Sequence, residues 1–584
     1  MDLRLLLAEP TEEEREAVDA VAGPAVVGNG RALEGGHEAR AQRHLLLPAL
    51  RSVQRRTGWV SEGALSYVCR RLSVPPADAY GVATFYAMLS LEPRPRRVVH
   101  VCDDLACRLR GGEKLAAALE GEDVVRSPCL GLCERAPAAL VTVAGPEPRE
   151  WAVAPADGES VTAPEPPQVT SRHLPQLGSP ELRLLGRVGV VDPESIDDYR
   201  AHGGYEALRV AVELGPTGVL AELSASKLLG RGGAAFPTAV KWEAVARQPA
   251  RPHYLVCNAD ESEPGTFKDR VLMEEDSFSV VEAMTIAGLT TGCELGYLYV
   301  RAEYPLAHER LAAAIAAARA HGLLGADVMG SGQAFEIELR HGAGAYICGE
   351  ETALFNSIEG LRGEPRNKPP FPVEVGLFGK PTVVNNVETL VNVLDVLVRG
   401  GATFAETGTA DSTGTRLFCV SGDVARPGLY ELPFGTTLRE LLELAQADEP
   451  KAVLLGGAAG SFVGPDQLDL RLTFEDTRTV GTTLGSGVVL VYGQSADLGD
   501  ALLRIAAFFR NESCGQCVPC RVGTVRQEEA LRRLSAGTPL GSVEDELALI
   551  GELAQAMRDA SICGLGQTAP NAVESAIQRL GVFA

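Results

Sequence analysis

The chain has 584 residues, a net charge of −23 and 45% hydrophobic residues. This length exceeds what one hydrophobic core usually serves, so we expect several domains. The acidic balance and the absence of a basic stripe disfavour nucleic acid as a partner. No apolar run approaches the roughly 20 residues of a membrane span, and the N-terminus lacks a secretory signal, so we expect a cytoplasmic protein without a membrane span. There the 13 cysteines stay reduced, and clusters of them indicate metal binding or catalysis rather than disulfides.

The N-terminal part divides into an extension and a mixed domain. Residues 1–40 form the extension, in which a capping-box pattern predicts a helix over Thr11–Val21. Leucine and valine then recur at i, i+3 and i+4 between residues 45 and 91, which predicts a small helical bundle. A strand over Arg97–Val101 begins a small α/β unit. We expect residues 41–145 to hold both the bundle and this unit.

Two cysteine pairs follow strands of this unit. Cys102 and Cys107 have C-x4-C spacing, and Cys129 and Cys133 have C-x3-C spacing. Four thiolates in two loops suit a [2Fe–2S] cluster at one end of the unit. Zinc is the alternative, but the C-x2-C spacing typical of zinc sites is missing from both pairs.

These cysteines and the stretch Tyr80-Gly-Val-Ala-Thr-Phe-Tyr86 resemble the thioredoxin-like [2Fe–2S] subunit of respiratory complex I, the 24-kDa type. The segment between the pairs, 108–128, is shorter than in that family, so a strand is expected to be trimmed. Residues 146–178 are rich in proline and show little periodicity, which predicts a linker.

Glycine-rich and acidic loops mark the next region, 179–405. Gly230-Arg231-Gly232-Gly233 precedes a helix, an arrangement that lets backbone N–H groups approach a phosphate. It matches neither a Walker A loop nor G-x-G-x-x-G, and a plain turn is the alternative. An apolar strand ending at Asn258 leads to Asp260, Glu261 and Glu263. Carboxylates at such a position bind ribose hydroxyls and repel a 2′-phosphate, which favours NAD over NADP, although a solvated turn is the plainer interpretation.

A second glycine-rich stretch, His341–Gly349, leads to Glu350 and Glu351 at a predicted helix start. Acidic residues there commonly only compensate the helix dipole. Their position beside another glycine-rich loop favours a ligand site. Further on, Asn385 and Asn386 offer amides that suit the edge of a planar heterocycle.

The C-terminal part is predicted to hold a β-grasp module at 406–495 and a helical domain at 496–584. Three cysteines of the helical domain repeat at C-x2-C-x2-C, which suits a [4Fe–4S] cluster; a four-cysteine zinc site is the alternative. A predicted helix over Val543–Ala560 returns the fourth ligand to this loop. The expected ligands are Cys514, Cys517, Cys520 and Cys563. The remaining cysteines are expected in the core: Cys69, Cys257, Cys293, Cys348 and Cys419.

Residues 180–584 resemble the FMN- and NADH-binding subunit of complex I, the 51-kDa type, and its relatives in soluble NAD-linked formate dehydrogenases and hydrogenases. The resemblance implies FMN-binding residues, namely Gly230, Arg231, Gly232, Lys241, Asn258, Asp260, Glu261, Asn385 and Asn386. It implies an NAD(H) site lined by Gly349 and by the catalytic residues Glu263, Glu350 and Glu351, with Phe236 and Phe371 stacking on adenine. Ala235 and Ser262 stand where the family commonly has glycine.

The expected fold is α/β and multidomain: a helical bundle with a thioredoxin-like ferredoxin domain, an α/β FMN/NADH domain, a β-grasp domain and a C-terminal helical bundle carrying a cluster. The expected function is a diaphorase that exchanges hydride between NAD(H) and FMN, and single electrons between FMN and the clusters. Its partner is expected to be a catalytic subunit with further iron–sulfur clusters, preferably a molybdopterin formate dehydrogenase subunit. A nickel hydrogenase and the complex I arm are the alternatives, and a non-catalytic iron–sulfur scaffold is the alternative of another class.

Overall fold

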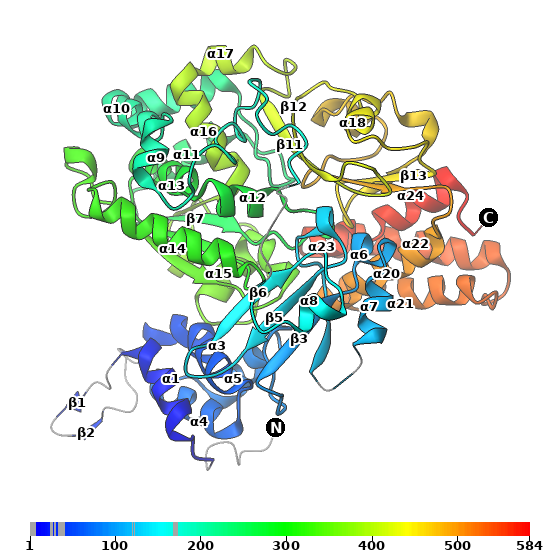
Figure 1. Cartoon of the computed structure of the whole chain (residues 1–584), viewed down its shortest axis with the longest axis horizontal. Helices are drawn as coiled ribbons and strands as arrows, with labels where there is room; N and C mark the ends of the chain where they lie inside the picture. The colour runs from blue at the N-terminus through cyan, green and yellow to red at the C-terminus, as the bar shows by residue number, and fades with distance from the viewer. Residues whose placement is uncertain are drawn as a thin grey trace.

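The computed structural model describes residues 8–23, 27–28, 31–32, 41–119, 121, 123–166 and 173–583. Figure 1 shows an N-terminal helical bundle and a small sheet below a larger α/β domain, with the C-terminal domains beside both. Within the described ranges no helix is long and apolar enough to cross a membrane.

Among the described residues, four α-helices form the N-terminal bundle. The capping box at Thr11 is present, because its side chain accepts from the Glu14 N–H and the Glu14 carboxylate accepts from the Thr11 N–H. Helix α1 packs on α3, so the helix of the expected extension belongs to the bundle. The apolar stripe predicted from the sequence is buried along α3. The elements are α1 (Glu12–Ala22), β1 (Val27–Gly28), β2 (Arg31–Ala32), η2 (Gln42–Leu45), α3 (Leu46–Thr57), α4 (Glu62–Leu72) and α5 (Pro76–Ala83).

A four-stranded sheet of order β4-β3-β5-β6 follows, in which only β3 and β4 are parallel. The expectation of a linker from residue 146 is wrong for residues 149–162. The prolines there flank β6, whose Trp151 and Val153 alternate into the core of this sheet. The described part of 108–128 keeps both a helix and a strand. The elements are β3 (Arg97–Cys102), α6 (Leu105–Leu109), α7 (Gly112–Ala118), β4 (Val124–Ser127), η3 (Cys133–Arg135), β5 (Ala139–Val143), β6 (Arg149–Val153) and α8 (Gly158–Thr162).

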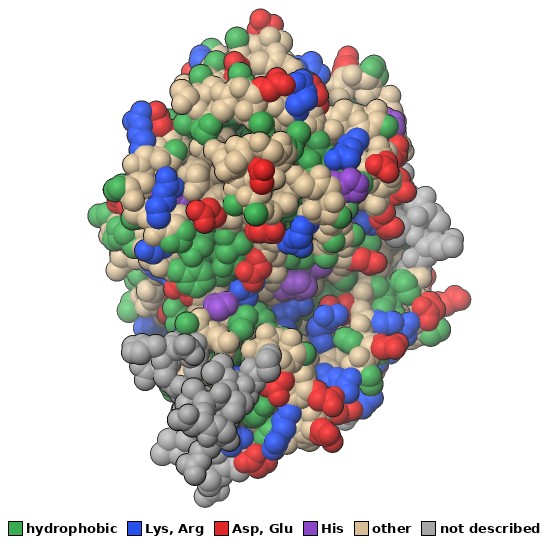
Figure 2. Space-filling model, turned by 90° about the vertical axis from the view of Figure 1, so that its left-hand side faces the viewer, with side chains coloured by type: hydrophobic (Ala, Val, Ile, Leu, Met, Phe, Trp, Pro, Cys, Tyr) green, Lys and Arg blue, Asp and Glu red, His purple; other side chains and the backbone are tan. Residues whose placement is uncertain are grey.

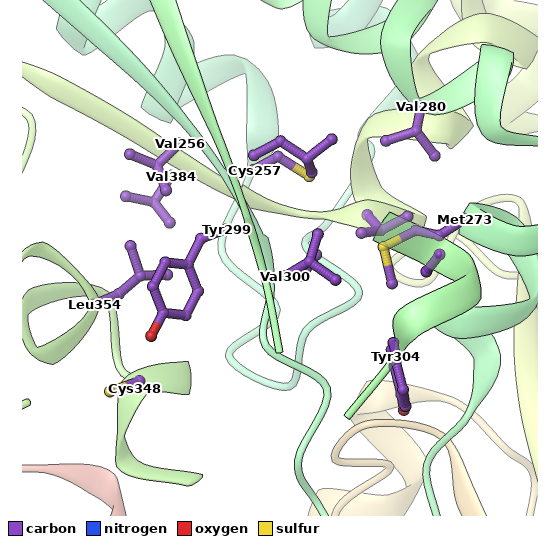
Figure 3. Close-up of a cluster of buried hydrophobic side chains, with 14 of the residues drawn as sticks. Val256, Cys257, Met273, Val280, Tyr299, Val300, Tyr304, Cys348, Leu354 and Val384 are labelled. Carbon is purple, nitrogen blue, oxygen red and sulfur yellow. The ribbon is translucent and has the colours of Figure 1, made fainter. Parts of the chain in front are cut away.

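The central domain is built on a parallel sheet of order β10-β7-β8-β9. Successive side chains of a strand point to opposite faces, and Figure 3 shows Val256 and Tyr299 on one side of the sheet and Cys257 and Val300 on the other. Both faces are therefore packed. The strands are β7 (His253–Ala259), β8 (Cys293–Val300), β9 (Glu336–His341) and β10 (Thr382–Asn386).

Helices cover both faces of this parallel sheet, as such sheets require. Every residue of α13 is buried, which fits a sequence that is mostly apolar or small, with Glu282 as its one charged residue. The helices are α9 (Ile196–Ala201), α10 (Glu206–Ser226), α11 (Thr238–Ala246), α12 (Lys268–Glu275), α13 (Ser277–Thr291), α14 (Pro305–Ala320), η4 (Val328–Gly330), η5 (Tyr346–Gly349), α15 (Glu351–Ile358), η6 (Leu377–Gly379), α16 (Val387–Arg399) and α17 (Gly401–Ala405).

The β-grasp module is a mixed sheet of order β12-β11-β15-β13-β14 with its own apolar core, as predicted. Its elements are β11 (Thr415–Gly422), β12 (Gly428–Pro433), α18 (Leu438–Leu444), β13 (Ala452–Leu455), β14 (Ser461–Val463), η7 (Pro465–Gln467), α19 (Phe474–Thr479) and β15 (Val488–Tyr492). The final domain is helical, and α22 has the bounds that the sequence predicts. Its helices are α20 (Leu498–Glu512), α21 (Val518–Ser535), α22 (Val543–Ala560), α23 (Gly564–Thr568) and α24 (Asn571–Leu580).

Candidate functional site

The loops singled out in the sequence meet at the carboxyl edge of the central parallel sheet. The chain runs from β7 to β8 and β9 on one side, and then returns to add β10 on the other side of β7. In such sheets ligands bind in the crevice outside the strand ends where the order reverses. Here that point lies between β7 and β10, where Asn258 and Asn386 are directly paired.

Glycines line this point closely. A Cβ at Gly232 would lie 3.0 Å from the Cβ of Asn386, and one at Gly349 would lie 3.5 Å from the Asp260 carboxylate. The Asn258 amide donates to the Gly349 carbonyl at 2.8 Å. The structure therefore brings together both glycine-rich loops and the ends of two strands, as predicted. A cradle of backbone and small residues fits a phosphate-bearing planar cofactor.

The side chain of Arg231 does not face this cradle. It is fully buried, donates to the Thr413 carbonyl at 2.7 Å, and its guanidinium lies 4.7 Å from the Phe434 ring centroid. Arg231 therefore joins the central domain to the β-grasp module, and only its backbone belongs to the glycine-rich loop. Ala235 has a φ of 52°, a conformation that favours glycine, which explains the family's usual residue there.

Two aromatic side chains and a lysine flank the cradle. Phe236 and Phe371 are 49% and 53% exposed, so their faces are free for a stacking ligand. The Lys241 ammonium lies 5.8 Å from the Phe236 ring centroid and donates to the Val384 carbonyl at 3.1 Å. Burial lowers the pKa of Lys241. Phe236 and Lys241 therefore lie side by side, and stacking of Phe236 and Phe371 on adenine stays a prediction.

Glu350 and Glu351 both form ion pairs with Lys368, a residue that was not predicted to belong to the site. The Lys368 ammonium lies 2.9 Å from a Glu350 oxygen and 2.7 Å from a Glu351 oxygen. The other Glu350 oxygen accepts from the N–H groups of Thr352 and Ala353 and so caps α15. Glu350 therefore has both the plain helix-capping role and a place at the site. In the sequence, Lys368 could have been noticed because it lies in a proline-rich loop, between Pro365 and Pro370.

Glu263 is held by a second missed residue, Tyr346. The Tyr346 hydroxyl donates to one Glu263 oxygen at 2.5 Å, and the Ala459 N–H of the β-grasp module donates to the other at 2.8 Å. Burial raises the pKa of Glu263 to about 7. This carboxyl group therefore titrates near neutrality, as a group that exchanges protons during a reaction must.

The other two carboxylates of this loop, those of Glu261 and Asp260, accept hydrogen bonds from groups within the protein. Glu261 accepts from the N–H groups of Asp269 and Arg270 at 2.8 and 2.9 Å, which anchors the start of α12. Asp260 accepts from the Ser262 hydroxyl at 3.1 Å, and burial raises its pKa to about 8. The expected repulsion of a 2′-phosphate by these carboxylates is thus not supported, because Glu261 is buried and both groups are already hydrogen-bonded.

The two asparagines at the end of β10 are positioned by neighbouring side chains. The Asn385 amide oxygen accepts from the Trp242 indole N–H at 2.8 Å. Asn386 accepts from Lys268 at 3.1 Å and donates to Asp269 at 2.6 Å. Lys268 is buried and was not anticipated from the sequence. This network fixes Asn386 beside the glycine cradle.

The first cysteine group lies against the central domain. Cys102, Cys107, Cys129 and Cys133 are buried, and the sulfur atoms of Cys129 and Cys133 are 3.3 Å apart. The Cys129 carbonyl accepts from Arg301 at 2.6 Å, and Arg301 also donates to the Glu261 carbonyl at 2.6 Å. One arginine therefore links this cysteine loop to the acidic loop after β7.

The second cysteine group lies beside the other glycine-rich loop. One small cavity is lined by Ile347 and by the four predicted cysteines, Cys514, Cys517, Cys520 and Cys563. The Glu512 carboxylate accepts from the Tyr346 N–H at 2.8 Å. The segment that carries Tyr346 and Gly349 thus separates the cradle from this cavity by a single layer of residues.

The cysteine spacing favours clusters over zinc. Neither Cys102 with Cys107 nor Cys129 with Cys133 has the C-x2-C spacing that is typical of zinc sites. A zinc ion draws each sulfur ligand to about 2.3 Å, whereas a cluster distributes its ligands over several irons. The five other cysteines are buried away from these groups, as expected.

The surface gives no sign of a nucleic-acid interface on the face that Figure 2 shows, where basic and acidic side chains alternate without a continuous basic stripe.

Family models match four parts of the chain. Residues 34–145 match the thioredoxin-like [2Fe-2S] ferredoxin, and residues 223–395 match the Nuo51 FMN-binding domain. Residues 417–445 match the SLBB domain, and residues 500–581 match the NADH-ubiquinone oxidoreductase-F iron-sulfur binding region.

Three curated relatives cover between two thirds and nearly the whole of this chain. The NADP-reducing hydrogenase subunit HndC of Solidesulfovibrio fructosivorans is 44% identical over 405 residues, which are 68% of this chain and 81% of that protein. An NADH-quinone oxidoreductase subunit of Rhizobium meliloti is 43% identical over 68% of this chain and 94% of its own length. The NAD-reducing hydrogenase HoxS subunit alpha of Cupriavidus necator is 33% identical over 573 residues, 92% of this chain and 91% of that protein.

A solved structure is similar over almost the same length. A chain in the crystal structure of NAD+-reducing [NiFe]-hydrogenase in the H2-reduced state superposes with a TM-score of 0.78 at 32% identity, covering 93% of this chain and 92% of that one.

Proposed function

Because the chain belongs to the family of 51-kDa-type FMN- and NADH-binding subunits, here continuous with a 24-kDa-type [2Fe–2S] domain, we propose that it is the diaphorase subunit of an NAD-reducing hydrogenase. The single observation that carries this proposal is the full-length match. A hydrogenase subunit that is 33% identical to this chain covers 92% of it.

The broader assignment does not depend on that proposal. The chain is an NAD-dependent flavin and iron–sulfur oxidoreductase with FMN, one [2Fe–2S] and one [4Fe–4S] cluster. The alternative of a non-catalytic iron–sulfur scaffold is therefore wrong. When bound, the flavin supplies the exchange between a two-electron hydride and single electrons, which clusters accept one at a time.

We assign the residues of the cradle as follows. Gly230, Gly232, Asn258 and Asn386 hold FMN at the switch point, where backbone groups approach its phosphate and ring. Phe236 and Phe371 stack on the adenine of NAD(H), and Lys368 offsets part of the negative charge of Glu350 and Glu351. Glu263, held by Tyr346 and Ala459, would exchange protons at this site.

Each of the two cysteine groups offers a route by which electrons can leave the flavin. Cys514, Cys517, Cys520 and Cys563 hold the [4Fe–4S] cluster, one layer behind Tyr346 and Ile347. Cys102, Cys107, Cys129 and Cys133 hold the [2Fe–2S] cluster, which Arg301 fixes against the acidic loop. We take the first as the exit towards a partner subunit, and we expect the complex to be cytoplasmic.

The test is the identity and activity of the native complex. The chain is isolated with its partners, which are identified by mass spectrometry, and NAD+ reduction is measured with hydrogen and with formate as donors. The proposal predicts a nickel-containing partner and hydrogen-dependent NAD+ reduction. A molybdopterin partner with formate-dependent reduction would instead support the formate dehydrogenase assignment, and a quinone-linked arm would support complex I.

A further inference from the structure

A small cavity lies where three parts of the fold meet, away from both cysteine groups and the flavin cradle. Its lining comes from α3, from residues 94–96, from β3 and β6, and from Ala343 of the central domain. The cavity volume is about 50 Å³. A water molecule occupies about 30 Å³ of liquid, and small-molecule sites span roughly 300 Å³ or more. The cavity therefore has room for a small ion and excludes a nucleotide.

Positive charge dominates this lining. Arg51, Arg55, Arg94 and Arg96 line the cavity together with one carboxylate, Glu150. That carboxylate lies 3.3 Å from Arg55, so it compensates one of the four cations.

The remaining arginines have little other compensation. Arg51 donates to the Gly342 carbonyl, which is neutral. The side chains of Arg94 and Arg96 make no hydrogen bond or ion pair with any residue that the structure describes. Arg94 is partly buried, which lowers its pKa, whereas Arg96 is exposed to solvent. The partial burial of an arginine without a counter-charge costs less when an anion joins it.

We propose that this cavity binds a small oxyanion of the phosphate or sulfate class. Guanidinium groups match the oxygen geometry of such anions in a bidentate way, and charge-assisted hydrogen bonds are the strong ones. One bound oxyanion satisfies Arg94 and Arg96 together.

The position of the cavity indicates that a bound anion stabilises the contact between the N-terminal parts and the central domain. The Met88 N–H donates to the Ala343 carbonyl at 3.0 Å, and the Ala87 N–H donates to the Gly344 carbonyl at 3.0 Å. Gly344 precedes by two residues the Tyr346 that holds Glu263. A bound anion thus fastens the N-terminal bundle and the first sheet to the loop that serves the nucleotide site, and it stabilises the docking of these parts.

The experiment measures binding of inorganic phosphate to the holoenzyme by calorimetry at constant ionic strength, together with the melting temperature. The variant R94Q/R96Q removes the two unpaired cations. The control R247Q/R526Q removes the same charge from exposed positions outside the cavity. We expect saturable binding of one phosphate per chain, a melting temperature that rises with occupancy, and affinity about tenfold or more weaker in R94Q/R96Q alone.

Two outcomes overturn the proposal. Equal affinity in all three proteins, or a response that never saturates, shows an adventitious ion only. If R94Q/R96Q does not fold, the wild-type protein is titrated with phosphate against sulfate by phosphorus NMR, and R94K provides the weaker variant. Absence of competition, or unchanged affinity in R94K, then contradicts a built site.

Discussion

Replacing Tyr346 by phenylalanine is expected to move the acid limb of NADH oxidation to higher pH. The hydroxyl of Tyr346 donates to Glu263 at 2.5 Å, and this bond favours the ionised carboxylate. Burial acts in the opposite direction and is the larger effect, so the pKa of Glu263 lies at about 7. The carboxyl group is therefore protonated below that pH and ionised above it.

The size of the shift follows from the lost hydrogen bond. A hydrogen bond to a charged group contributes about 1.5–3 kcal/mol, and one pKa unit corresponds to about 1.4 kcal/mol. The Ala459 N–H still donates to the carboxylate in the variant. We therefore expect the smaller end of that range, which raises the pKa of Glu263 by about one unit.

The assay is the pH dependence of kcat/KM for NADH with ferricyanide as the acceptor. With Glu263 active in its ionised form, wild-type activity falls as the pH drops through about 7, and Y346F activity falls about one unit higher. The control E263Q has no titrating group there and loses this limb altogether. An acid limb at the same pH in Y346F, or one that persists in E263Q, refutes the assignment of Glu263.

Three further variants test separate parts of the site. Cys563→Ala is expected to abolish the [4Fe–4S] signal in paramagnetic resonance while FMN content stays unchanged; loss of the [2Fe–2S] signal instead would contradict the ligand set. Gly232→Ala places a Cβ 3.0 Å from that of Asn386, and such overpacking should weaken FMN retention about tenfold in fluorescence titration; normal retention would exclude the cradle. Tyr86→Phe removes the buried hydrogen bond to Ser357, 2.8 Å long, and should lower the free energy of unfolding by about 1 kcal/mol; an unchanged melting temperature would contradict this stabilising role.

Patterns that depend on neighbouring residues could be predicted from the sequence. The helix that returns Cys563 to its loop has the predicted bounds, because its amphipathic stripe and capping box are local signals. The cysteine groups followed from spacing alone. The edge strand β6 was missed because prolines on both sides obscured the alternation of Trp151 and Val153.

Roles set by distant residues could not be predicted in this way. Arg231 turns towards Thr413 and Thr415, which lie more than 180 residues further along the chain. Glu261 anchors α12 rather than a ligand, because the free N–H groups at a helix start compete for a buried carboxylate. Tyr346 lies in a stretch in which only the glycines drew attention. Its hydrogen bond to Glu263 joins residues that are far apart in the sequence, so the sequence alone could not predict it.

The central claim is that electrons from NADH pass through the flavin cradle to the C-terminal cluster. Its most direct test is anaerobic mixing of NADH with the holoenzyme, while flavin absorbance and the [4Fe–4S] paramagnetic signal are followed, with flavin-depleted protein as the control. The account predicts that the flavin bleaches and the cluster is then reduced, and that NADH reduces no cluster in the control. Cluster reduction by NADH without flavin, or a bleached flavin beside a cluster that stays oxidised, would contradict it.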